Sequence, residues 1–276
     1  MEHIHEIFVQ TGIPDGVIQY FHCGNIKKLE TIARSPQIKL ICFTGSVAGG
    51  LQVQKAAADR VVPVGLELGG KDPAYIREDV DVKWAAEEIV DGVVFNSGQS
   101  CCSVERVYVA ERVHDQFVSA VQKVLQGYKL GDPFDKTTNV GPVISKRSAE
   151  TIKAHVDDAI SKGAIDSTPA NQSFASPPPS GNYIKPTLLT NVSHDMDVMN
   201  DETFGPVIPV MRVGNDEEAI RLMNDSEFGL TASIWTKDTA KGEELAEQVE
   251  AGTVFINRCD FPSPVSRLRN HNEDKC

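Results

Sequence analysis

Two adjacent cysteines, Cys101 and Cys102, are the residues of this sequence best suited to covalent chemistry. They follow a turn at Gly98, between an apolar helical stretch and a predicted strand at Arg106–Val109. A cysteine on such a turn can be exposed, and backbone N–H groups beside it can stabilise a thiolate and bind an oxyanion. A small buried hydrophobe is the more common fate of a free cysteine, and the pair taken alone favours that interpretation.

A carboxylate, Glu67, precedes the cysteines within L-E-L-G-G-K at 66–71. It follows a run of Val and Leu that is typical of a strand, and burying a carboxylate without a partner is costly. At the C-terminal end of a strand it would lie where open α/β sheets place their sites. Alternatively, Lys71 or backbone amides satisfy it.

Two further segments have features that suit a nucleotide. E-T-F-G-P predicts a rigid turn that offers the Glu202 carboxylate beside the ring of Phe204, which suits a ribose diol and a nicotinamide edge but also a plain turn. F-T-G-S closes a predicted strand and opens a helix, so Gly45 and Ser46 could meet a pyrophosphate at the helix N-terminus. Without a G-x-G-x-x-G pattern, that second signal is not specific by itself.

Short apolar strands that alternate with helices must position these residues. Such alternation predicts parallel βαβ units in a mixed α/β protein. Up to residue 69 we expect the end of a helix at residues 5–11, strands at Val17–Phe21, Ile38–Phe43 and Val61–Leu66, and a helix running to about Asp59.

The alternation continues after residue 69. Apolar residues at helical spacing run from Val113 to Leu125 and from Ile152 to Ile160. Asn215 with Glu218 resembles a helix capping box. We also expect a helix C-cap at Gly252, a buried strand at Thr253–Asn257, an exposed loop at 167–182 and an unpacked tail at about 260–276.

Composition and charge exclude several classes of function. The 276 residues are 41% hydrophobic and carry a net charge of −12, and an acidic surface repels phosphate backbones, so we expect no nucleic-acid partner. No apolar run approaches a membrane span, and no signal peptide is visible. Six cysteines without zinc spacing predict neither a disulfide scaffold nor a metal site, so we expect a reducing, cytoplasmic setting.

Taken together, the motifs resemble the aldehyde dehydrogenase superfamily in order and context. The resemblance covers about residues 5–258. It rests on F-T-G-S at 43–46, L-E-L-G-G-K at 66–71, G-Q-x-C at 98–101, E-x-F-G-P at 202–206 and N-x-x-x-F-G-L-x-A at 224–232. It implies an α/β fold with a partial Rossmann-type cofactor domain at 1–69, an α/β catalytic domain with a parallel-rich sheet at 70–257, and a divergent C-terminal tail at 258–276.

The resemblance also implies a reaction, the oxidation of an aldehyde to a carboxylic acid. Cys101, two places after Gln99, resembles the family's nucleophile, with Cys102 as a bystander. Attack on the aldehyde would give a thiohemiacetal, and loss of hydride would leave a thioester. Glu67 resembles the general base that activates the cysteine or the hydrolysing water.

The family's cofactor residues carry over in the same way. Glu202 resembles the ligand of the nicotinamide ribose, with Phe204 packing nearby, and Gly45 and Ser46 lie where the family contacts the pyrophosphate. The implied cofactor is NAD or NADP, and the implied partner is a small-molecule aldehyde. No metal is implied.

Some of the family's pattern is not found in these residues. The P-W-N segment, whose Asn supplies half of the oxyanion hole, and the K-P-x-E segment, which holds the adenosine ribose, have no match, nor has the oligomerisation strand that would follow residue 258. We therefore expect a chain truncated at both ends, without the elements that make the family typically homo-oligomeric. The alternatives to an active dehydrogenase are an impaired fragment that only binds, or a residual thiol esterase.

Overall fold

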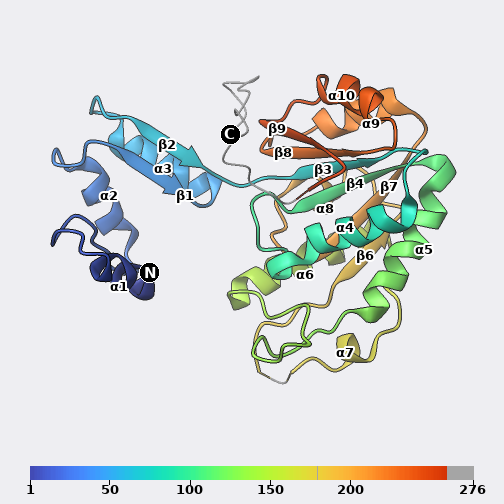
Figure 1. Cartoon of the computed structure of the whole chain (residues 1–276), viewed down its shortest axis with the longest axis horizontal. Helices are drawn as coiled ribbons and strands as arrows, with labels where there is room; N and C mark the ends of the chain where they lie inside the picture. Colours follow the sequence, from blue (N-terminus) through green and yellow to red (C-terminus); the bar gives the residue numbers. More distant parts are fainter. Residues whose placement is uncertain (179, 260–276) are drawn as a thin grey trace. The chain divides into compact units, whose positions relative to one another are not determined.

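The computed structural model describes residues 1–178 and 180–259 (Figure 1). The tail expected at about 260–276 lies outside this part of the chain. The chain divides into two compact units, one covering Met1–Leu68 and the other beginning at Gly69. Each unit has a β-sheet of its own.

The first unit is built around a parallel pair of strands. Thr44 pairs with Glu67 at the end of the ladder, and the helix between the two strands makes a βαβ unit, as the sequence predicted. The elements of this unit are α1 (Glu2–Gln10), α2 (Ile26–Arg34), β1 (Ile41–Thr44), α3 (Val47–Ala57) and β2 (Val64–Glu67).

The strand expected at Val17–Phe21 does not form, so that prediction was wrong. Both of its end residues are exposed, and neither sheet contains this segment. Gly12 and Gly16 have φ angles of 78° and 82°, which turn the chain on its way out of α1. A strand without a neighbour leaves its backbone N–H and C=O groups unpaired, and this apolar run finds no neighbour in its unit.

The second unit contains a seven-stranded sheet, with strand order β5-β6-β7-β4-β3-β8-β9. All neighbouring pairs are parallel except β5 with β6, which are antiparallel, so the expected parallel-rich sheet is confirmed. The strands are β3 (Asp72–Ile76), β4 (Val104–Ala110), β5 (Ile165–Asp166), β6 (Thr187–Thr190), β7 (Val207–Val213), β8 (Thr231–Trp235) and β9 (Thr253–Ile256).

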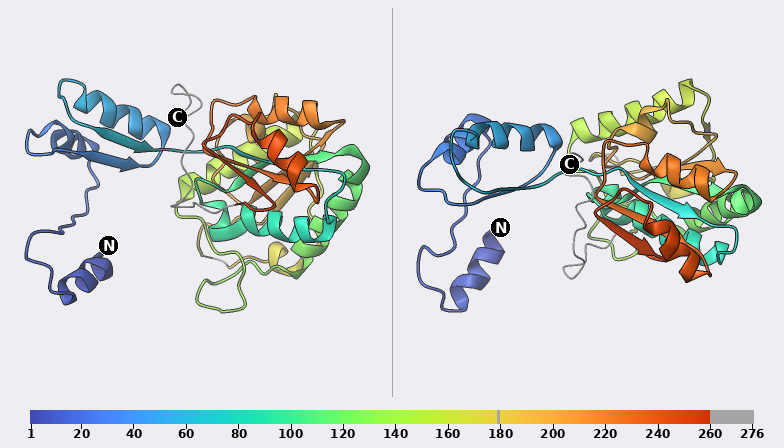
Figure 2. Two further views of the ribbon diagram at one scale, coloured as in Figure 1. Left: turned by 45° about the horizontal axis from the view of Figure 1, so that its top comes forward. Right: turned by 90° about the horizontal axis from the view of Figure 1, so that it is seen from above.

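Helices cover both faces of this sheet (Figure 2). The chain passes from β3 to β4 and from β7 to β8 in opposite directions along the sheet, and parallel crossovers are right-handed, so their connecting helices lie on opposite faces. The helices are α4 (Val82–Val94), α5 (Glu111–Gly127), α6 (Lys146–Ser161), α7 (Gln172–Ala175), α8 (Asp197–Asn200), α9 (Asp216–Asn224) and α10 (Thr239–Ala246).

The core of the second unit lies along its two central strands. Every residue of β3 and β4 is buried, as expected for parallel strands covered on both faces. The helical stripe predicted within 113–125 is confirmed, because Phe117, Val121 and Leu125 on α5 are fully buried.

Three local expectations turn out differently or only in part. The loop at 167–182 contains the short helix α7, whose Phe174 is buried in the core. Gly252 does not cap a helix: α10 ends six residues earlier, and the Gly252 N–H donates to the carbonyl of Gly229 ahead of β9. The capping box at Asn215 forms in part: Asn215 Oδ1 accepts from the N–H of Glu218 at 2.8 Å, but the Glu218 carboxylate accepts from the N–H of Gly214 instead of that of Asn215.

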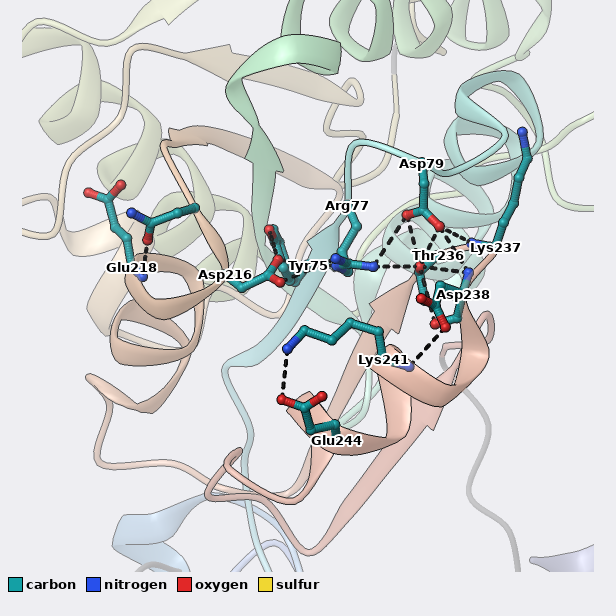
Figure 3. Close-up of polar contacts among 11 residues, drawn as sticks. Tyr75, Arg77, Asp79, Asp216, Glu218, Thr236, Lys237, Asp238, Lys241 and Glu244 are labelled. Atoms are coloured by element: carbon teal, nitrogen blue, oxygen red, sulfur yellow. Dashed lines mark hydrogen bonds and ion pairs between the residues drawn. The ribbon is translucent and has the colours of Figure 1, made fainter.

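A polar cluster fixes the carboxyl end of β3 (Figure 3). Arg77 donates from Nε and Nη2 to Asp216 at 3.1 and 3.2 Å, and from Nη1 to Thr236 Oγ1 at 3.0 Å. The Tyr75 hydroxyl donates to Asp216 at 2.7 Å, and Asp79 accepts from the Thr236 hydroxyl at 2.8 Å. This cluster, the Arg77 clamp, ties β3 to the start of α9 and to the loop after β8.

Candidate active site

The sheet topology brings three of the motif segments to one edge. Residues 69–71 precede β3, residues 98–101 precede β4, and residues 202–206 precede β7. These strands are neighbours in the order β7-β4-β3 and run parallel, so all of them begin at the same edge. The candidate site of the second unit therefore lies at the amino ends of its strands. Glu67, in the first unit, is instead the last residue of β2, at a carboxyl end as expected.

The cysteine loop begins with an unusual backbone. Asn96, Ser97 and Gly98 have φ angles of 49°, 62° and 74°. A left-handed conformation costs a residue with a side chain about 1–2 kcal/mol, and such strain is characteristic of functional sites. After this turn Cys101 is exposed, whereas Cys102 is buried. Cys102 is therefore buried as most free cysteines are, whereas Cys101 is not.

The Glu202 carboxylate lies against the G-G-K segment. Its Oε1 accepts from the backbone N–H of Gly70 at 3.1 Å. A Cβ built on Gly69 would stand 2.5 Å from Glu202 Oε2, so only glycine leaves room for the carboxylate there. Burial raises the pKa of Glu202, and the Gly70 N–H opposes that shift.

The rest of the E-T-F-G-P turn packs against the cysteine loop. Phe204 has a φ of 50°, and its side chain is partly exposed. A Cβ on Gly205 would come within 2.5 Å of Ile152 on α6, and a Cβ on Gly98 would collide with the Gly205 backbone. The two motifs therefore touch through glycines, and larger residues would separate them.

A buried ion pair lies beneath the turn, and sequence reasoning did not predict it. Lys71, considered above as a partner for Glu67, donates from Nζ to Glu105 at 2.6 Å and to Thr203 Oγ1 at 3.0 Å. The Lys71 side chain is 0% exposed and that of Glu105 is 5% exposed. Two adjacent charged residues in the apolar run V-E-R-V-Y-V were the available signal, because a buried charge requires a partner.

The first unit carries the other predicted residues. Ser46 is the N-cap of α3, and its hydroxyl accepts from the N–H of Gly49 at 3.2 Å. The Gly45 N–H donates to the carbonyl of Glu67 at 3.0 Å, so the F-T-G-S and L-E-L-G-G-K segments meet within this unit. Cβ atoms on Gly45 or Gly49 would stand 2.8 Å from the Phe43 ring, which lies close to these two glycines.

The predicted site residues thus form two groups. Cys101, Glu202 and Phe204 belong to segments that gather at one edge of the second unit, while Gly45, Ser46 and Glu67 gather at the end of the β1–β2 pair. Among residues 1–178 and 180–259, no group of three or more His, Cys, Asp or Glu side chains is arranged to hold a metal ion. Nor does any helix in this part of the chain have the length and apolarity needed to cross a membrane.

Comparisons with known proteins agree with the motifs. Residues 1–267 match the aldehyde dehydrogenase family. The chain is 39% identical over 252 residues to 4,4'-diapolycopene aldehyde oxidase of Methylomonas sp, covering 91% of this chain and 46% of that protein. It is 35% identical over 259 residues to lactaldehyde dehydrogenase of Escherichia coli, covering 93% and 53%. The chain spans about half the length of these relatives.

Solved structures show the same likeness. The NADP complex of NADP-dependent glyceraldehyde-3-phosphate dehydrogenase from Bacillus halodurans superposes with a TM-score of 0.87 at 35% identity, covering 96% of this chain and 55% of that one. The NAD+ complex of betaine aldehyde dehydrogenase from Staphylococcus aureus gives 0.87 at 31% identity, covering 94% and 52%. The motifs, the fold and the match over residues 1–267 show that this chain belongs to the aldehyde dehydrogenase family.

Proposed function

We propose that this chain oxidises a small aldehyde to a carboxylic acid with NAD or NADP, using Cys101 as the nucleophile. The observation that carries the proposal is the exposure of Cys101 on a strained loop that touches the turn bearing Glu202. A nucleophile needs access to substrate, and strained backbone persists where the surrounding structure enforces it. We also propose a cytoplasmic setting, because cysteines without a disulfide framework are typical of reducing compartments.

Each unit, taken by itself, carries residues that suit part of a nicotinamide dinucleotide. The Glu202 carboxylate accepts from Gly70 through Oε1, and a carboxylate has further lone pairs for the two hydroxyls of a ribose. In the first unit, α3 begins at Ser46 with Gly49 and Gly50 in its first turn, which suits a pyrophosphate. When bound, the nicotinamide supplies the acceptor for the hydride.

Cys101 forms the covalent intermediates of the reaction and is regenerated at its end. Its thiolate attacks the aldehyde carbon to form a thiohemiacetal, and loss of hydride from that carbon leaves a thioester on the sulfur. Glu67, the last residue of β2, takes a proton from the water that attacks the thioester and passes it to the departing sulfur, which releases the carboxylic acid and the thiol.

Aldehyde-dependent reduction of NAD or NADP, followed by absorbance with a panel of aldehydes, tests this function. We expect activity in the wild type and none in Cys101→Ala, with Cys102→Ala as the matched control that retains it. Equal activity in wild type and Cys101→Ala would contradict the assignment. Activity absent from a folded wild type would reject the dehydrogenase function for this chain.

Ester hydrolysis by Cys101 is a second candidate activity, supported by the exposure of this thiol. It needs no nicotinamide, because an activated ester acylates the cysteine directly and water removes the acyl group. Hydrolysis of p-nitrophenyl acetate that Cys101→Ala abolishes, in a protein without aldehyde oxidation, would favour this candidate over the first.

A further inference from the structure

A buried carboxylate outside the motifs, that of Glu105, accepts two hydrogen bonds from the turn that carries Glu202. Oε2 of Glu105 accepts from the backbone N–H of Thr203 at 2.7 Å, and its Oε1 accepts from that of Phe204 at 2.8 Å. The Lys71 ammonium neutralises the carboxylate at 2.6 Å. Hydrogen bonds to a charged acceptor are roughly twice as strong as neutral ones. Two consecutive peptide groups of the turn are therefore fixed by one side chain.

One of these hydrogen bonds holds a residue whose backbone is strained. Phe204 adopts a left-handed conformation with a φ of 50°, and a residue with a side chain stays in that region only when its surroundings enforce it. The Thr203 hydroxyl is held as well, by Lys71 Nζ at 3.0 Å and His155 Nδ1 at 3.1 Å. Thr203 and His155 are both buried, so water cannot replace these contacts readily.

The same contacts lead back to the Glu202 carboxylate. Glu202 precedes Thr203 in the turn, and it binds Gly70, which precedes Lys71. The chain of contacts therefore closes a ring, from Gly70 to Glu202 and through Glu105 back to Lys71. A shift of the Glu105 side chain would therefore displace both the Thr203 peptide group, which follows Glu202, and the Lys71 side chain, which follows Gly70.

We propose that Glu105, paired with Lys71, is a positioning residue that holds the Glu202 carboxylate in place for the cofactor ribose without touching the cofactor itself. The proposal rests on the proposed role of Glu202. It differs from a purely structural ion pair, whose loss would lower stability without selectively loosening the turn.

Hydrogen exchange of the Glu105→Gln variant tests the positioning directly. The amide replaces one acceptor oxygen with a donor, so at least one of the Thr203 and Phe204 N–H groups loses its partner. The Gly70 N–H reports on the Glu202 carboxylate, which it binds. We expect exchange at Gly70 and at one or both turn amides to quicken by about ten-fold or more, the effect of losing a charged hydrogen bond, with core β4 amides unchanged.

A second variant keeps the test decisive if Glu105→Gln fails to fold. Lys71→Met/Glu105→Leu removes both charges, and replacing a buried ion pair with apolar residues often preserves stability. We expect this double variant to fold while exchange at Gly70 and at the turn amides remains fast. Wild-type exchange at these amides in the folded double variant would overturn the proposal.

Cofactor affinity completes the experiment, by calorimetry with NAD and with NADP. We expect the dissociation constant to rise about ten-fold or more in the double variant, in line with the lost hydrogen bonds. Asp216→Asn in the Arg77 clamp is the matched carboxylate control. We expect this variant to bind the cofactor with wild-type affinity and to show wild-type hydrogen exchange at Gly70 and at the turn amides. Loosened exchange with unchanged affinity would overturn the positioning role. If the wild type binds neither cofactor, the proposed role of Glu202 fails, and exchange at Gly70 still decides whether Glu105 positions it.

Discussion

The two ends of β3 carry polar clusters of opposite electrostatic character. At the amino end, beside the motif segments, burial raises the pKa of Asp72 well above its ordinary value and also raises that of Glu202. Within the described residues, Asp72 Oδ1 has no hydrogen-bond partner, and its other oxygen accepts only from Thr231. Asp72 and Glu202 are thus desolvated and have few donors, whereas Glu105 at the same end is paired with Lys71.

The acids at the carboxyl end have several donors each. Burial acts on Asp79 and Asp216 too, but hydrogen bonds outweigh it, from Thr236 in the first case and from Arg77 and Tyr75 in the second. The pKa values of both carboxyls therefore lie below their ordinary value.

This difference distinguishes a structural cluster, the Arg77 clamp, from a candidate ligand-binding site at the amino end of β3. The Arg77 clamp stabilises the fold by satisfying every charge it contains. The opposite edge keeps two carboxyl groups, Asp72 and Glu202, short of donors, which costs stability and is the pattern expected where groups must act on a ligand.

Removing one partner of the buried pair should cost the most. Lys71→Met leaves Glu105 charged and without its cation in the core, and we expect the free energy of unfolding to fall by about 3–5 kcal/mol. Urea denaturation measures this. The control is Lys71→Met/Glu105→Leu, which should recover most of the loss. A single variant as stable as the wild type would show that the pair is not buried in solution.

Breaking the Arg77 clamp should cost less. Arg77→Met removes charged hydrogen bonds worth about 1.5–3 kcal/mol, but Asp216 and Asp79 are partly exposed and can be rehydrated. Urea denaturation should show this smaller loss, with unchanged cofactor affinity in calorimetry. A loss larger than that of Lys71→Met would reverse the contrast between the two ends.

The clamp should also make stability sensitive to acid. Because the folded pKa values of Asp79 and Asp216 are lowered, their contribution is complete above the unfolded value of about 4 and is lost as the pH falls through the folded values. Asp216→Asn should flatten this acid branch in urea titrations at several pH values. An unchanged slope would mean that Asp216 titrates normally.

Asp72 should show the opposite sign, and its substitution should have the smallest effect of the series in acid. Its folded pKa is raised, so its contribution is complete below about 4 and is lost as the pH rises through the folded value. Asp72→Asn mimics the neutral carboxyl, so it should change stability by under about 1 kcal/mol in acid and remove the loss on the alkaline side. The same titrations, extended to high pH, give the answer.

The sequence predicted the parts of the fold that depend on local pattern. The cap at Asn215, the helix at 113–125 and the parallel crossovers follow from spacing and capping chemistry within short windows. Glycines in the motifs fall where the backbone has no room for a Cβ, as at Gly98.

What the sequence did not predict depends on strand order. Residues 202–206 meet the cysteine loop because β7 pairs with β4, and no local pattern specifies that pairing. Glu105 was missed for the same reason, since its partners Thr203 and Phe204 are distant in the sequence. The strand expected at Val17–Phe21 does not form because an apolar run without a neighbouring strand does not make a sheet.

The most direct test of the central claim is to trap the acyl group on the enzyme. Glu67→Gln should still form the thioester but hydrolyse it slowly, so mixing this variant with an aldehyde and NAD or NADP, followed by an acid quench, should leave an acyl mass on the peptide that contains Cys101. We expect that adduct on Cys101, with none in Glu67→Gln/Cys101→Ala. An adduct on another cysteine, or none in a variant that binds the cofactor, would contradict it.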